Sequence, residues 1–219
     1  RYIFIFNGEI YNYLELKVDL EKKGLHFKTK TDTEVFMEGL INEGPSFQLK
    51  CNGMWSYCLW DNKLNKAILG RDRFGVKPLY YYTFNDNSLI FASEMKAITP
   101  FLNEITPSEN IEKNLDNVFD YEYTDSCVIE GIKRILPGNY VIYEDKIFKE
   151  YQYWNTLDNI DFLENNYHSQ VEEWRELFLD SVKLRMRSDV KISSTLSGGL
   201  DSSSVVAAMK YLDKEYIPI

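Results

Sequence analysis

The chain has 219 residues, of which 44% are hydrophobic and 15% aromatic, enough for one substantial core or two modest ones. Its formal net charge of −9 excludes the broad positive field that draws proteins to nucleic acid or to anionic membranes. No apolar run approaches the roughly 18 to 20 residues that cross a bilayer, and no secretion signal is recognisable. The composition therefore predicts a globular cytoplasmic protein that binds small molecules, with neither nucleic acid nor a membrane as partner.

The three cysteines, Cys51, Cys58 and Cys127, are an odd number and lack the spacing of metal ligands. The two histidines, His26 and His168, lie far apart in the sequence. We therefore expect reduced, structural thiols.

The chain opens with a predicted strand, Tyr2 to Phe6, which we expect to stop at Asn7-Gly8 because this pair is typical of turns. A helix is predicted over Tyr13 to Lys23. A second helix is predicted to begin at the capping run Thr31 to Glu34 and to end at Gly44-Pro45.

From Gly53 to Ser93, short aromatic and β-branched runs predict an antiparallel meander. Helices are expected over Glu94 to Phe101 and Glu109 to Tyr121, and a hairpin over Arg134 to Tyr151 with its turn at Glu144 to Lys146. This half of the chain is therefore predicted to have a mixed α+β fold. The expected strands of the meander are Met54 to Trp60, Ala67 to Arg71, Pro78 to Thr83 and Leu89 to Ala92.

A polar, acidic stretch from Asn155 to Asn166 predicts a linker, and we expect domains over residues 1–155 and 163–219. The second domain is predicted to open with a helix and then a strand, a tight turn, a helix and a further strand, which is the start of a parallel α/β sheet. These elements are expected near Val171 to Leu184, Val190 to Leu196, Ser197 to Asp201, Ser202 to Leu212 and Glu215 to Ile219.

The segment SGGLDSS, Ser197 to Ser203, has the composition of a phosphate-binding loop between a strand and a helix. Glycines let the backbone approach an anion closely, and the helix start supplies N–H donors. The loop lacks the Gly-Lys-Ser/Thr ending of a Walker loop, and Asp201 instead places a carboxylate where it could help to hold Mg²⁺. The alternative is a plain tight turn with Asp201-Ser202 as an ordinary helix cap.

This loop resembles the PP-loop of the ATP pyrophosphatase family, whose members cleave ATP between its α and β phosphates. The resemblance implies that the loop holds the pyrophosphate end of Mg-ATP, and we expect no tightly bound organic cofactor. It assigns ATP binding to Leu196, Ser197, Gly198, Gly199, Leu200, Asp201, Ser202 and Ser203, and Mg²⁺ binding to Asp201.

Four further segments occur in order: FNGEIYN from Phe6, TDTE from Thr31, RDRFGVKPLYY from Arg71 and FASE from Phe91. In this order they resemble the glutaminase domain of class II amidotransferases, and together with the SGGLDSS loop they resemble the asparagine synthetase branch. The resemblance implies an α/β/β/α domain of the Ntn-hydrolase type with antiparallel sheets, followed by the start of a parallel-sheet PP-loop domain.

The resemblance also implies that an N-terminal cysteine thiolate attacks glutamine and releases ammonia. The amide of Asn7 and the main-chain N–H of Gly8 match the family's oxyanion donors, and Gly8, Glu9 and Asp32 match its glutamine site. Taken alone, Asn7-Gly8 is usually a turn and Asp32 a helix cap.

The nucleophilic cysteine has no counterpart here, because the chain starts with Arg1. The family's arginine for the glutamine carboxylate has none either. We expect the first domain to be truncated at its N-terminus and the second at its C-terminus, and this chain alone to be inactive. The charged group Arg71, Asp72, Arg73 and Lys77 is predicted to form a structural ion-pair network in preference to a basic binding patch.

For the whole protein, the resemblance implies an asparagine synthase that hydrolyses glutamine and passes ammonia to aspartate activated as β-aspartyl-AMP, with release of AMP and pyrophosphate. The implied partners are glutamine, ATP and aspartate, and a homodimer is one candidate assembly. Two alternatives stay open. The acceptor could be a different one, such as a uronic acid of a surface polysaccharide or a peptide, or the protein could be a non-catalytic homologue.

Overall fold

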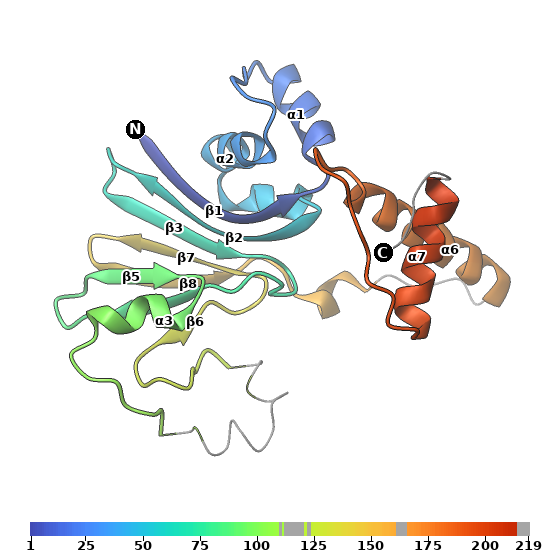
Figure 1. Cartoon of the computed structure of the whole chain (residues 1–219). Helices are drawn as coiled ribbons and strands as arrows, with labels where there is room; N and C mark the ends of the chain where they lie inside the picture. Colours follow the sequence, from blue (N-terminus) through green and yellow to red (C-terminus); the bar gives the residue numbers. More distant parts are fainter. Residues whose placement is uncertain (110, 112–120, 122–123, 161–165, 214–219) are drawn as a thin grey trace. The chain divides into compact units, whose positions relative to one another are not determined.

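The computed structural model describes residues 1–109, 111, 121, 124–160 and 166–213 (Figure 1). These residues form two compact units, Arg1–Asp158 and Asn159–Ile219, each of which is described by itself.

The first unit contains two antiparallel sheets. The five-stranded sheet has the order β1-β2-β3-β7-β8, with β1 at Tyr2–Ile10, β2 at Gly53–Asp61, β3 at Lys66–Arg71, β7 at Asn139–Glu144 and β8 at Ile147–Gln152. The three-stranded sheet has the order β5-β4-β6, with β5 at Leu89–Ala92, β4 at Tyr80–Thr83 and β6 at Lys133–Arg134.

Helices cover the outer faces of the two sheets, so that the unit has four layers in the order α/β/β/α (Figure 1). On the five-stranded sheet lie α1 at Tyr13–Lys22, α2 at Asp32–Glu43 and a 3-10 helix, η1, at Gly44–Lys50; on the three-stranded sheet lies α3 at Met95–Ile98, continued by a 3-10 helix, η2, at Thr99–Phe101. This arrangement confirms the predicted α+β class and its antiparallel sheets.

The inner layers are held by side chains that alternate along each strand. In β2, Trp55 and Tyr57 face the helices, where they surround the fully buried Phe36 of α2 with ring centroids 5.6 and 5.2 Å away. On the opposite face of β2, Cys58 packs into a second core between the two sheets. Tyr81 of β4 enters this second core and stacks on Phe148.

Tyr80 and Tyr82, which flank Tyr81, point to the opposite face of the sheet and pack under α3 with Ile98. The Tyr80–Tyr82 run therefore alternates between two cores.

Three of the elements expected in the first unit differ from the structure. β1 continues through Asn7-Gly8 to Ile10, and the expected meander is divided, because β2 and β3 belong to one sheet and β4 and β5 to the other. Arg134 pairs with β4, so the last hairpin is confined to β7 and β8, with positive φ at Asp145 and Lys146 in its turn. The helix expected over Glu109 to Tyr121 lies mostly outside the described residues.

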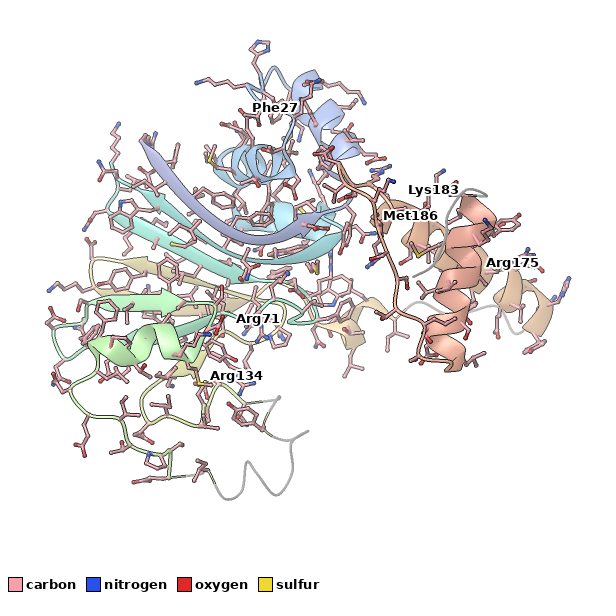
Figure 2. The ribbon with its side chains drawn as sticks, in the orientation of Figure 1. Phe27, Arg71, Arg134, Arg175, Lys183 and Met186 are labelled. Carbon is pink, nitrogen blue, oxygen red and sulfur yellow. The ribbon has the colours of Figure 1, made fainter. Side chains whose placement is uncertain are left out.

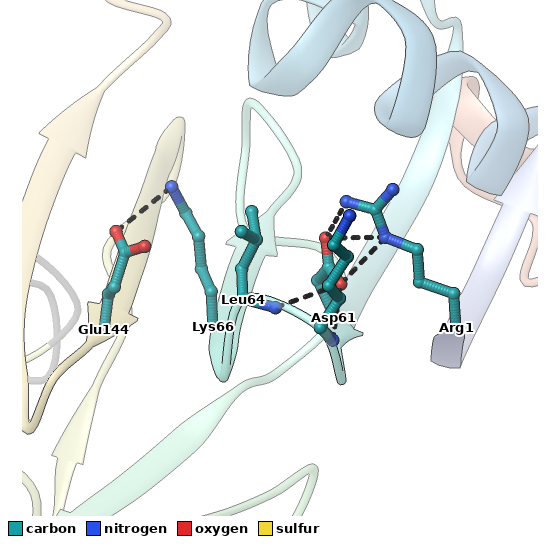
Figure 3. Close-up of polar contacts among 6 residues, drawn as sticks. Arg1, Asp61, Leu64, Lys66 and Glu144 are labelled. Atoms are coloured by element: carbon teal, nitrogen blue, oxygen red, sulfur yellow. Dashed lines mark hydrogen bonds and ion pairs between the residues drawn. The ribbon is translucent and has the colours of Figure 1, made fainter.

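At the end of the β1–β2 ladder where Tyr2 pairs with Asp61, Arg1 and Asp61 form an ion pair (Figure 3). Arg1 donates from Nη2 to Asp61 Oδ2 at 2.7 Å, and Asp61 also accepts the main-chain N–H groups of Lys63 and Leu64. The hydrogen bond from Arg1 holds the pKa of Asp61 down at about 2. Between β3 and β7, Lys66 Nζ lies 3.3 Å from Glu144 Oε2.

The second unit is built on two helices, α6 at Tyr167–Arg185 and α7 at Leu200–Leu212. A small core of Val182, Ala208 and Met209 joins them. The strand expected at Val190 to Leu196 is not formed, because a strand needs a hydrogen-bonded neighbour and no described segment pairs with these residues. The strand expected at Glu215 to Ile219 lies outside the described residues. Among the described residues, no helix is both long and apolar enough to span a membrane.

The charged run that follows β3 is bound to main-chain atoms. Arg71, labelled in Figure 2, is 6% exposed and donates to the carbonyls of Gly75, Lys77 and Ile135. Arg73 donates to the carbonyls of Cys51 and Leu49. The sequence predicts a structural ion-pair network for this charged group, whereas these hydrogen bonds of Arg71 and Arg73 go to main-chain carbonyls.

Asp72 is the centre of this run, and its side chain is 1% exposed. Its two carboxylate oxygens accept the N–H groups of Trp55, Phe74, Val76 and Lys77 at 2.9 to 3.2 Å. The carboxylate therefore fixes the turn after β3 against β2.

We predict that Asp72→Ala lowers the free energy of unfolding by at least about 3 kcal/mol, because each buried N–H left without an acceptor costs about 1–3 kcal/mol. Asp72→Asn keeps one acceptor oxygen and loses less. Urea denaturation followed by tryptophan fluorescence measures both changes. Asp86→Ala is the matched control, since Asp86 caps an exposed turn through Ser88. Equal stability of the Asp72 and Asp86 variants would contradict the assigned role of Asp72.

Each of the three cysteines is buried in a different core cluster of the first unit: Cys51 beneath the helices, Cys58 between the sheets and Cys127 near α3. Burial raises the pKa of all three thiols, to about 12 for Cys58. The reactive thiolate is therefore scarce at neutral pH.

We predict that iodoacetamide leaves all three thiols of the folded protein unmodified at mildly alkaline pH and alkylates all three in concentrated urea. Mass spectrometry of the intact protein and of its peptides gives the count and the sites. Rapid alkylation of Cys51, Cys58 or Cys127 in the folded protein would show that one of them is an accessible nucleophile.

Candidate functional site

The predicted oxyanion donors lie near the end of β1, within its ladder with β2. Asn7, Gly8 and Glu9 pair with Ser56, Trp55 and Met54 respectively. A Cβ atom on Gly8 would come within 2.1 Å of the Met54 carbonyl oxygen and 2.7 Å of the Trp55 Cα atom. Glycine is needed here for the close approach of two strands, which is why a pair typical of turns is found inside a strand.

The Asn7 side chain points away from the α1–α2 layer. Phe4 and Phe6 contact Phe36 of α2, so alternation directs Asn7 to the opposite face of the sheet. There it lines a cavity of about 210 Å³, and its Nδ2 donates to Ser93 Oγ at 3.2 Å. The other lining residues of this cavity are Ile5, Ser56, Tyr57, Cys58, Leu79, Phe91 and Ala92.

Ser93 directly follows β5 and belongs to the FASE segment. The motif comparison includes this residue but predicts no role for it. Its position beside Asn7, which is 86 positions earlier in the chain, becomes visible only when the two sheets are packed together.

Asp32 is brought to the same end of β1 by the start of α2. Thr31 caps this helix, with its Oγ1 accepting from the N–H of Glu34, as the capping run predicts. Asp32, the first helical residue, accepts from the main-chain N–H of Ile10 at 2.9 Å and from the hydroxyl of Thr33 at 3.2 Å. The half-buried carboxylate is thereby oriented next to the segment that carries Asn7, Gly8 and the exposed Glu9.

This end of β1 thus presents an amide donor, a glycine backbone and two carboxylates. Carboxylates bind ammonium groups, and fixed N–H donors stabilise an oxyanion. This is the chemistry that the resemblance described above expects of a glutamine site.

The Ser197–Ser203 loop lies in the second unit and leads into α7. Gly198 has φ of +82°, a left-handed conformation that favours glycine, and Gly199 is the N-cap of the helix. No side chain caps the helix start; the hydroxyl of Ser202 instead lies 2.9 Å from that of Ser197 and donates to the Gly199 carbonyl. The first N–H groups of α7 therefore remain for an anion, as at other helix starts.

Asp201 stands in the first turn of α7 with an exposed side chain. Within the part of the chain that the structure describes, no three His, Cys, Asp or Glu side chains gather to hold a metal ion. Mg²⁺ is ordinarily held by one or two carboxylates together with substrate phosphates. Asp201 consequently fits Mg²⁺ only as a partner of bound phosphates. The loop residues Leu196 and Leu200 are likewise exposed.

Comparison with known proteins adds the family. Residues 1–154 match the model of a glutamine amidotransferase domain, and residues 173–218 match that of asparagine synthase. A solved structure of the allosteric regulatory enzyme of purine biosynthesis superposes with a TM-score of 0.51 at 19% identity, over 70% of this chain and 28% of that one. At this identity the likeness shows the fold alone.

Curated relatives match nearly the whole chain, among them the following three. The putative glutamine-hydrolysing asparagine synthetase 2 of Methanocaldococcus jannaschii is 38% identical over 95% of this chain and 40% of that protein. Asparagine synthetase 1 of Bacillus subtilis is 37% identical over 95% of this chain and 33% of its own length. A Gibberella zeae protein named amidase chry2 is 31% identical over 96% of this chain and 31% of that protein.

The chain thus spans two fifths or less of the length of these relatives. The similarity to the glutamine-hydrolysing asparagine synthetases that the motifs predict is confirmed by the first two of them. With the match over residues 1–154, the chain belongs to the glutamine amidotransferase domain family.

Proposed function

We propose that this chain is part of an ATP-dependent ligase that hydrolyses glutamine and transfers the ammonia to aspartate, forming asparagine. This proposal is carried by one observation: a single chain joins a glutamine amidotransferase domain to a match with asparagine synthase. Each part contains the motif residues expected for it. The first unit supplies ammonia, and the second activates the acceptor.

In the first half-reaction, a cysteine thiolate adds to the side-chain amide carbon of glutamine, and the carbonyl electrons move to oxygen. The Asn7 Nδ2–H and the Gly8 N–H stabilise this oxyanion. Asp32 and Glu9 receive the ammonium group of the substrate. Collapse of the adduct, with a proton delivered to the leaving nitrogen, releases ammonia and leaves a thioester for water to cleave.

In the second half-reaction, a carboxylate oxygen of aspartate attacks the α-phosphorus of ATP, and the bond to the β-phosphate breaks. The N–H groups at the start of α7 and the Ser197 and Ser202 hydroxyls hold the departing pyrophosphate. Asp201 would hold Mg²⁺ against these phosphates, where the ion would supply charge neutralisation. Ammonia then attacks the acyl carbon and displaces AMP.

A second acceptor class has its own support. The relative named amidase chry2 matches this chain over 96% of its length, and its name is not that of an asparagine synthetase. The same two half-reactions could therefore amidate a different carboxylate, such as that of a uronic acid or a peptide.

We predict that the complete protein, given glutamine, Mg-ATP and aspartate, forms asparagine, AMP and pyrophosphate in equal amounts. Chromatography of the nucleotides and amino acids, with a coupled assay for pyrophosphate, measures all three products. Formation of ADP and phosphate would overturn the assignment of the Ser197–Ser203 loop. Turnover with a uronic acid or a peptide in place of aspartate would move the proposal to the second acceptor class.

We predict that Asn7→Ala lowers kcat for glutamine hydrolysis on the order of 10² to 10³-fold, because one oxyanion donor is lost. Synthesis from added ammonium salt should be unchanged, since it bypasses the first unit. Asn85→Ala is the control, as it makes the same chemical change in an exposed turn. An Asn7→Ala protein that hydrolyses glutamine at the normal rate would exclude Asn7 as an oxyanion donor.

A further inference from the structure

The hydrogen bond between Asn7 and Ser93 joins two elements that are held independently. Asn7 lies in β1 of the five-stranded sheet, and its register with β2 is fixed by nine residue pairs. Ser93 follows β5 of the other sheet, whose last residue, Ala92, pairs with Tyr80. Ile98 of α3, which begins two residues after Ser93, is fully buried. Neither partner can move far without disturbing a packed layer.

The surroundings of this bond strengthen it. Ile5, Leu79 and Phe91 line the same cavity of about 210 Å³ as Asn7 and Ser93. A hydrogen bond in apolar surroundings is electrostatically stronger than one in water, so the Ser93 hydroxyl competes well with solvent for the amide.

A side-chain amide nitrogen carries two N–H groups. The Ser93 oxygen accepts one of them, and because the amide is planar, the direction of the second is then set. An oxyanion donor is effective when it is already aimed before the charge develops, since it then needs no reorganisation during the reaction. The hydrogen bond to Ser93 therefore fixes the direction in which the second N–H of Asn7 points.

We propose that Ser93 is a positioning residue for Asn7: its hydroxyl holds one amide N–H so that the other is aimed at the oxyanion of glutamine hydrolysis. This inference rests on the function proposed above. It adds a residue whose effect passes through Asn7 and is felt in the transition state, after glutamine has bound.

The test compares the complete protein with Ser93→Ala, Ser93→Thr and Ser88→Ala. Ser88→Ala is the matched control, because it removes a hydroxyl from the same β4–β5 hairpin, where Ser88 donates to Asp86. The bond is of the kind that contributes about 0.5–1.5 kcal/mol, which corresponds to up to about tenfold in rate. We expect Ser93→Ala to lower kcat for glutamine hydrolysis by about two- to tenfold while KM for glutamine stays within about twofold.

Ser93→Thr keeps the hydroxyl and should restore most of the rate. Synthesis from added ammonium salt reports whether a variant is folded and should not change. The decisive readout is the double variant: once Asn7 is alanine, Ser93→Ala should cost nothing more, because residues that act as a unit are not additive.

Two results would overturn the positioning role while leaving the proposed function intact. One is a Ser93→Ala protein with an unchanged kcat. The other is a double variant about tenfold slower than Asn7→Ala alone, which would mean that Ser93 acts independently of Asn7. A wild-type protein that uses ammonium salt but does not hydrolyse glutamine would instead refute the proposed function, and the positioning role with it.

Discussion

The pairing of β1 with β2 is the constraint on which the rest of the first unit depends. The ladder runs from Tyr2 opposite Asp61 to Ile10 opposite Gly53, and a shift by one residue would turn every side chain to the wrong face. Phe4 and Phe6 would then leave the aromatic cluster around Phe36, and Asn7 would point into the helices.

A different interaction fixes the register at each end of this ladder. At one end, Arg1 and Asp61 form an ion pair with two nitrogens on the carboxylate. At the other end, Gly8 and Gly53 allow the backbones to meet so closely that no side chain fits at either position. Asp32 then ties the end of β1 to α2. The candidate site therefore lies at an end of the ladder where both backbone packing and a helix hold the strand.

Local signals in the sequence were sufficient for the elements that depend on local chemistry. The cap at Thr31, the end of α2 at Gly44 and the turn at Asp145-Lys146 use side-chain and backbone preferences of a few adjacent residues, and all were found as predicted. The Asn7-Gly8 pair was misread as a turn because the reason for its glycine lies on another strand. The division of the expected meander and the contact of Ser93 with Asn7 also depend on long-range packing, to which neighbouring residues give no clue.

The two candidate sites also differ in how far they depend on long-range packing. The roles proposed for Asn7, Gly8, Glu9 and Asp32 were inferred from motif order. The structure places Asp32, at the start of α2, against the main chain of Ile10, at the end of the strand that carries Asn7, Gly8 and Glu9. The Ser197–Ser203 loop needs little beyond a glycine with positive φ and the start of one helix. The contacts of the first site involve two sheets, whereas the contacts described for the second lie within its own seven residues and the helix that follows them.

The side chains of Arg71, Asp72 and Arg73 have a consequence for how this domain can vary. Their partners are carbonyl and N–H groups, which every residue except proline provides in full. The residues at positions 49, 51, 76 and 77 can therefore change their side chains without breaking these bonds, provided the backbone keeps its path. Gly75 is the exception, because its φ of +66° suits glycine. Three charged side chains can thus preserve the junction of β2, β3 and the following turn while the sequence around them diverges.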